Sequence, residues 1–176
     1  YCHVVKHVFW SPQIGALLAL QAHWTVSQMI ATVVMPTGTG KTETMIAATV
    51  QEQAECVLVI VPSDALRTQI AGAFSKLGIL PKAGLIDGAA RRPIVSLLRK
   101  RPTSVEDARA LFSMSNVVVT TMSVAAGKAP EIQAAMADCT THLFIDEAHH
   151  VGARTWRELR QAFRGVKTIQ FTATPF

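Results

Sequence analysis

Cysteine is scarce in this sequence, and its three residues, Cys2, Cys56 and Cys139, stand far apart. None of them forms a Cys-x-x-Cys pair or a Cys/His cluster with the spacing of metal ligands, so the sequence offers no zinc site. An odd, scattered set of cysteines is typical of a reducing compartment, and we expect a cytoplasmic protein. We expect Cys56 and Cys139 to serve as small hydrophobic core residues.

Charge and long hydrophobic runs are also limited. Charged residues make up 16% of the 176 residues and hydrophobic residues 49%, a balance that excludes intrinsic disorder. The apolar stretch Cys56–Val61 is far shorter than the ~18 residues that a membrane-spanning helix needs. The N-terminal residues lack the order of a signal peptide, and the chain begins with Tyr1 rather than Met. We therefore expect one globular domain of a longer protein, without a membrane span.

The positive charge is modest but locally concentrated. Seventeen basic residues against twelve acidic ones give a net charge of +5, which favours phosphate-rich partners only weakly. Five of the basic residues lie in Ala89–Thr103, which contains no acidic residue. Its prolines, Pro93 and Pro102, bracket a short apolar block, so we predict an inserted helix or loop on the surface. This run could bind a phosphate backbone, or it could serve solubility alone.

Short apolar runs alternate with amphipathic segments along the chain. Continuous apolar runs of strand length suit parallel strands that are covered on both faces. Predicted strands are Thr32–Met35, Cys56–Val61, Ala83–Ile86, Asn116–Thr120, His142–Ile145 and Thr168–Phe171. Predicted helices are Thr42–Ala54, Asp64–Leu77 (capped by Ser63 and ended by Gly78), a segment capped by Ser104, Glu131–Ala137 and Arg154–Phe163. The alternation predicts an α/β fold with a mainly parallel central sheet.

The segment Met35-Pro-Thr-Gly-Thr-Gly-Lys-Thr42 lies between a predicted strand and a predicted helix, the context that a phosphate-binding loop requires. Its glycines allow backbone N–H groups to face phosphate oxygens, and the helix N-terminus adds positive potential. Lys41 can reach the β and γ phosphates, and the Thr42 hydroxyl can bind Mg²⁺. Met35 replaces the usual opening glycine. The alternative is a glycine-rich turn with a chance Lys-Thr pair. The predicted nucleotide-binding residues are Pro36, Thr37, Gly38, Thr39, Gly40, Lys41 and Thr42.

A second chemical segment, Phe144-Ile-Asp-Glu-Ala-His-His150, begins in a predicted strand. Asp146 falls at the carboxyl end of that strand, where it can hold Mg²⁺, and Glu147 can orient or deprotonate the attacking water. A solvated acidic turn is the alternative, and a phosphate loop on a neighbouring strand argues against it. The two histidines lack a third metal ligand at suitable spacing, so we favour His149 as a hydrogen-bonding link to a neighbouring element.

Five segments resemble, in order, the motifs of superfamily two helicases, the DEAD/DEAH group. Met35–Thr42 is similar to motif I and Asp146–His149 to motif II. Val61–Gln69, Val119–Met122 and Thr172–Pro175 resemble motifs Ia, Ib and III. The pairing of Asp-Glu-Ala-His-His with Thr-Ala-Thr-Pro-Phe is most similar to the type III restriction enzyme res-subunit branch and related DNA helicases.

The resemblance implies that residues 1–176 form a three-layer, RecA-like first motor domain of the phosphate-loop NTPase class. In this group a second such domain follows motif III and supplies an arginine finger; its motifs are absent from this sequence. The resemblance also implies that Gln13, within Phe9–Leu17, reads adenine, although Gln13 could equally be a plain helix cap.

The resemblance further implies where nucleic acid and coupling residues lie. Single-stranded nucleic acid would cross motifs Ia and Ib, where Ser63, Arg67 and Thr121 are candidates for phosphate contacts. Arg67 could instead be an ordinary exposed helix residue. His149, Thr172 and Thr174 would link the nucleotide state to the grip on nucleic acid. 

We therefore expect the ATP-binding motor domain of a DNA helicase or translocase that uses ATP and Mg²⁺, with RNA as the second candidate substrate. One alternative is a nucleotide-responsive module that grips nucleic acid without unwinding it. Another is a small-molecule kinase, which would need a basic lid and would not explain Val61–Gln69 or Thr172–Pro175.

Overall fold

The computed structural model describes residues 9–126, 129–147 and 153–173. A six-stranded sheet forms its centre, in the order β1-β6-β5-β2-β4-β3, and every neighbouring pair is parallel. The strands are β1 (Ala31–Val34), β2 (Val57–Val61), β3 (Val95–Leu98), β4 (Val117–Thr121), β5 (His142–Asp146) and β6 (Lys167–Thr172). The helices are α2 (Ser11–Val26), α3 (Lys41–Gln51), α4 (Asp64–Lys76), α5 (Val105–Ser113), α6 (Met122–Ala125), α7 (Pro130–Asp138) and α8 (Ala153–Ala162).

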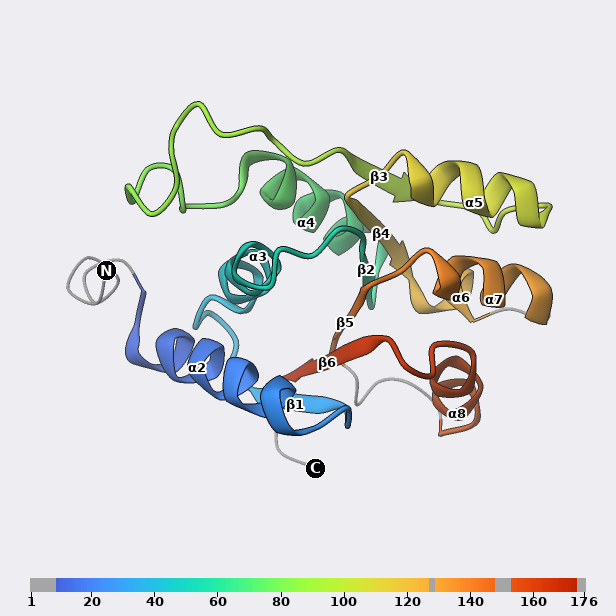
Figure 1. Cartoon of the computed structure of the whole chain (residues 1–176), viewed down its shortest axis with the longest axis horizontal. Helices are drawn as coiled ribbons and strands as arrows, with labels where there is room; N and C mark the ends of the chain where they lie inside the picture. Colours follow the sequence, from blue (N-terminus) through green and yellow to red (C-terminus); the bar gives the residue numbers. More distant parts are fainter. Residues whose placement is uncertain (1–8, 127–128, 148–152, 174–176) are drawn as a thin grey trace.

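Helices cover both faces of the sheet, which gives three layers. Helices α2, α3 and α4 lie on one face and α5, α6, α7 and α8 on the other (Figure 1). Each face of the sheet carries its own hydrophobic core. In strand β2, Val57 and Val59 pack in the first core, with α2, α3 and α4, and Leu58 packs in the second, with α5, α6, α7 and α8. Because successive side chains of a strand point to opposite faces, a strand covered on both faces buries every residue. The predicted three-layer α/β fold is confirmed.

Local capping signals set several helix ends. The Ser63 hydroxyl accepts a hydrogen bond from Leu66 N (3.4 Å) at the start of α4, and Ser104 accepts one from Asp107 N (3.0 Å) at the start of α5. Helix α4 ends at Leu77 and Gly78, both with positive φ, of 59° and 54°. These ends agree with the predicted caps.

Two predictions between α4 and α5 are wrong. Ala83–Ile86 forms turns rather than a strand, because its amides bond locally: Ala83 N donates to Ile79 O (3.0 Å) and Leu85 N to Leu80 O (3.1 Å). The strand lies instead within the basic run that was predicted to be a surface helix or loop. That strand, β3, is held by parallel pairing with β4, a contact between distant segments.

The cysteines that the structure describes are free and belong to the second core. Cys56 is buried, and burial raises the pKa of its thiol to about 11, which keeps it protonated. Cys139 is partly buried and packs against the same cluster. Both therefore serve as core residues, as predicted. Among the described residues, the helices are all too short or too polar to cross a membrane.

Candidate functional site

The carboxyl ends of β1, β5 and β6 meet at one edge of the sheet, as they must in a parallel arrangement. The loop after β1 begins at Met35, whose backbone N donates to Thr172 O at 2.8 Å at the end of β6. The expectation that the loop strand neighbours the strand of Asp146 is wrong, because β6 lies between β1 and β5. Strand β6, whose last residue Thr172 opens the segment that resembles motif III, thus separates the two halves of the site.

The loop owes its shape to glycine. Gly38 and Gly40 have φ values of 83° and 86°, a left-handed conformation that side chains with a Cβ avoid. A Cβ on Gly40 would also lie 2.2 Å from Gln13 Nε2. Thr39 closes the turn, since its hydroxyl donates to Pro36 O at 2.6 Å. Gly40 then caps α3, so the first amides of that helix open toward the loop.

Gln13 joins α2 to this loop. Its Oε1 accepts from Trp10 N (2.8 Å), which completes a capping box, and its Nε2 donates to Gly40 O (3.3 Å). The side chain is 5% exposed. Gln13 therefore takes part in capping α2 and holds the backbone at the point where α3 begins, while adenine recognition by Gln13 stays a prediction.

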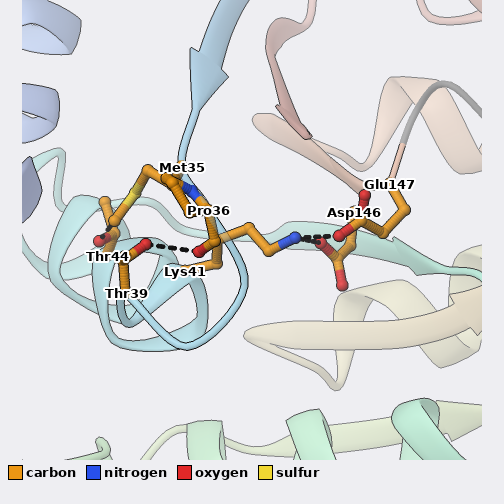
Figure 2. Close-up of polar contacts among 7 residues, drawn as sticks. All are labelled: Met35, Pro36, Thr39, Lys41, Thr44, Asp146 and Glu147. Atoms are coloured by element: carbon orange, nitrogen blue, oxygen red, sulfur yellow. Dashed lines mark hydrogen bonds and ion pairs between the residues drawn. The ribbon is translucent and has the colours of Figure 1, made fainter. Parts of the chain in front are cut away.

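Lys41 meets two carboxylates from β5 and the residue after it. Its Nζ forms an ion pair with Glu147 Oε1 and lies 3.6 Å from Asp146 Oδ1, and all three side chains are less than one-fifth exposed. Figure 2 shows both carboxylates directed at the ammonium group. Glu147 has a φ of 52°, which is unusual for a residue other than glycine and typical of functional positions.

Asp146 has the environment of a cation ligand. Burial raises the pKa of its carboxyl, and the charge of Glu147 adds to that, while Lys41 opposes it. Within the described residues, Asp146 Oδ1 is buried and accepts no hydrogen bond shorter than 3.5 Å, with the Lys41 ammonium 3.6 Å away. No group of three or more His, Cys, Asp and Glu residues lies together there. A single, largely buried carboxylate such as that of Asp146 fits Mg²⁺, which uses one or two protein oxygens together with substrate phosphates and water.

The sequence matches the family described as type III restriction enzyme, res subunit, over residues 6–176. The chain belongs to this family. No curated protein matched this res-subunit domain.

Solved structures of helicases and of a restriction-modification enzyme share the fold of the res-subunit domain. The UvsW helicase from bacteriophage T4 superposes with a TM-score of 0.63 at 15% identity, covering 94% of this chain and 52% of that one. The Pyrococcus furiosus Hef helicase domain gives 0.60 at 22%, covering 93% and 32%. The Type ISP restriction-modification enzyme LlaGI gives 0.61 at 16%, covering 95% and 17%.

These likenesses confirm the predicted three-layer α/β fold, which the res-subunit domain shares with solved helicase structures. The res-subunit domain spans about half the length of the UvsW chain and less of the other two.

The three candidates for nucleic-acid contact differ in exposure. Ser63 is exposed, whereas Thr121 is 7% exposed and its hydroxyl lies 3.1 Å from Ser123 Oγ. Arg67 is 4% exposed and its Nη1 lies 2.9 Å from Asp64 Oδ1, so the alternative of an exposed helix residue is wrong. Phosphate contact by these residues stays a prediction.

The coupling candidates are only partly described. Thr172 is fully buried at the end of β6, and its carbonyl holds Met35 N. His149 and Thr174 lie outside the described residues. 

Sequence reasoning missed two side chains near the loop. Glu43 accepts a hydrogen bond from Ile79 N at 3.0 Å, which ties the first turn of α3 to the end of α4. Thr44 donates to Gly40 O at 3.1 Å and lies 3.6 Å from the sulfur of Met35, which is buried. An acidic residue in the first helical turn was the available signal for Glu43. The unusual Met35 is therefore a core side chain that packs under the loop.

Proposed function

We propose that this domain is the first of two motor domains in a DNA-directed ATPase, a helicase or translocase powered by ATP hydrolysis. A second RecA-like domain of the same protein would close the nucleotide cleft. The observation that supports this most is the convergence of Lys41, Asp146 and Glu147 beside a glycine-shaped loop at a helix N-terminus. 

The residues present suit ATP and Mg²⁺. Loop amides and the start of α3 offer positive potential to phosphate oxygens, and Lys41 offers a mobile cation. Thr42 and Asp146 would hold Mg²⁺. When bound, that ion neutralises charge on the β and γ phosphates.

Lys41 links binding to hydrolysis. Its ammonium pairs with Glu147, and a γ phosphate competes for the same ammonium. When Lys41 contacts phosphate, the Glu147 carboxylate becomes available to accept a proton from water. This competition supports the assignment of Lys41 to phosphate binding and of Glu147 to water activation.

The order of strands supports a coupling between the nucleotide state and the grip on nucleic acid. Thr172 ends the strand that separates the loop from Asp146, and it is bonded to the loop. A change in the conformation of the loop can therefore reach β6 through the hydrogen bond between Met35 and Thr172. We assign coupling to Thr172, with Thr174 and His149 as further candidates, and nucleic-acid contact to Ser63, Arg67 and Thr121.

DNA is the favoured partner. The similar structures include LlaGI in complex with a DNA substrate mimic and the DUF1998 helicase MrfA bound to DNA and AMPPNP. The free thiols of Cys56 and Cys139 support a reducing, cytoplasmic location.

Nucleotide binding by Lys41 tests the proposal. Lys41→Ala should weaken ATP binding more than tenfold, about 1.4 kcal/mol, because the phosphates lose their cation. Lys82→Ala, at an exposed lysine in the turns after α4, is the matched control and should bind ATP normally. Isothermal titration calorimetry measures both, and equal affinities would remove Lys41 from the site. In the full-length protein, DNA binding without translocation or strand displacement would favour the binding-module alternative.

A further inference from the structure

Part of the basic run lies at the functional edge of the sheet. Strand β3 is parallel to β4, with Leu98 opposite Thr120, and the Thr120 hydroxyl donates to Leu98 O at 2.9 Å. Arg99, the residue after β3, therefore lies at the level of Thr121, the last residue of β4. This part of the run, which the sequence leaves outside every motif, lies beside the motif Ib segment.

The turn after β3 is anchored by Arg101. Its guanidinium donates to the carbonyl oxygens of Ser123 (3.1 Å), Val124 (3.3 Å) and Ala126 (3.5 Å). These bonds attach the turn to α6, the short helix that begins directly after Thr121. Arg101 thus has a structural role that Arg99 and Lys100 do not share.

Arg99 and Lys100 are exposed, and among the described residues neither has an ion-pair partner. Their backbone is held between β4 and the anchor at Arg101. Two exposed, uncompensated cations on a backbone that Arg101 ties to Ser123 suit phosphate oxygens.

The ends of β2, β4 and β3 form a row that begins at Ser63 and passes Thr121. Neighbouring strands lie about 4.8 Å apart, so the row extends about 10 Å across the sheet edge. We propose that Arg99 and Lys100 bind backbone phosphates of single-stranded DNA and extend the nucleic-acid site beyond β4. The inference rests on the proposed function, because that function supplies DNA as the ligand.

The test compares two charge-matched double variants of the 176-residue chain. Arg99→Gln with Lys100→Gln removes the proposed contacts. Lys82→Gln with Arg91→Gln removes the same charge from exposed residues that precede β3, toward the opposite edge of the sheet. Fluorescence anisotropy with labelled oligothymidylate, over a series of salt concentrations, gives the binding constant and its salt dependence for each protein.

We expect the Arg99/Lys100 variant to bind at least about tenfold more weakly at low salt. The slope of log K against log salt should fall by about 1.4 in magnitude, roughly 0.7 for each lost contact. The Lys82/Arg91 variant should keep the parental slope. A swap variant, Arg99→Lys with Lys100→Arg, keeps both charges and should also keep the slope.

Three results would overturn the inference. An unchanged slope in the Arg99/Lys100 variant, or an equal loss in both double variants, would do so while leaving DNA binding and the proposed function intact. Failure of the parent to bind DNA, although it binds ATP, would overturn the DNA-directed part of the proposed function as well. Thermal melting should show equal stability for all variants, since the substituted side chains are exposed.

Discussion

Glu147 combines a strained backbone with a proposed catalytic role. Its φ of 52° is unfavourable for a residue with a Cβ and costs roughly 1–3 kcal/mol in general. The adjacent Asp146 ends β5 with ordinary strand geometry. The change of backbone conformation between the two residues brings both carboxylates to Lys41 from consecutive positions (Figure 2).

Replacement of Glu147 should separate binding from hydrolysis. Glu147→Gln keeps the shape but removes the base, so the full-length protein should retain ATP affinity and lose turnover by on the order of 100-fold or more. Phosphate release with DNA present measures turnover, and calorimetry measures affinity. Glu131→Gln, at an exposed position in α7, is the control. Parental turnover in Glu147→Gln would contradict the assigned role.

Two glycines in different settings provide a matched pair. Gly40→Ala places a Cβ at positive φ and 2.2 Å from Gln13 Nε2, so it should lower stability and weaken ATP binding. Gly72→Ala lies within α4 with nothing within 4 Å, and it should raise stability by about 0.5–1 kcal/mol. Chemical denaturation measures both changes. Equal effects would show that the loop conformation does not depend on Gly40.

At the scale of elements, β5 begins in a buried aromatic cluster. The His142 ring is 5.5 Å from that of Trp24 and 6.4 Å from that of Phe144, and His142 is 5% exposed. Burial lowers the pKa of His142 to about 4, and the charge of Lys167 lowers it further, while Glu52 opposes the shift. Lys167 and Glu52 are themselves paired at 2.8 Å.

This cluster predicts a loss of stability in mild acid. The folded pKa of His142 lies below the unfolded value of 6.5, so the unfolded chain takes up the proton first and stability falls as pH falls from about 6.5 to 4. The loss is at most about 3 kcal/mol. Asp146, whose pKa is raised, acts in the opposite direction. 

A variant isolates the contribution of His142. Denaturant unfolding across this pH range should show a steeper slope for the parent than for His142→Gln, whatever the absolute stability of the variant. Identical slopes would mean that His142 is protonated in the folded state as readily as in the unfolded chain.

Predictions for the elements succeeded where the local pattern was strong. Continuous apolar runs marked β2 and β5, and serine caps marked α4 and α5. Helix α2 was not predicted as a helix, because its apolar residues, such as the exposed Leu18 and the buried Leu17, do not keep to one face. Strand β3 was missed because its four residues are only partly buried, apart from Leu98, and depend on pairing with β4.

At the scale of the whole molecule, the proposed function predicts that a second domain completes the nucleotide cleft. In the proposed site, Lys41 and a Mg²⁺ ion bound by Thr42 and Asp146 would supply charge from this domain only. An arginine finger from another domain is worth on the order of 10³–10⁵ in rate in related enzymes. 

The 176 residues alone should therefore fold, bind ATP weakly and hydrolyse it barely above background, with or without DNA. A phosphate-release assay on the purified chain, with single- and double-stranded DNA, measures this. Robust DNA-stimulated turnover that Lys41→Ala abolishes, and that persists at dilutions where dimers dissociate, would show that one domain suffices.

The sequence by itself determined the alternation of strands and helices, the glycine-shaped loop at Lys41, the carboxylates at Asp146 and Glu147, and the resemblance to helicase motifs. These depend on neighbours in the chain, through side-chain period, capping and the conformational freedom of glycine. Only the tertiary structure decided that β6 lies between the two halves of the site, and that Arg99 lies beside Thr121. Strand order and register come from pairing between distant segments, which no local pattern contains.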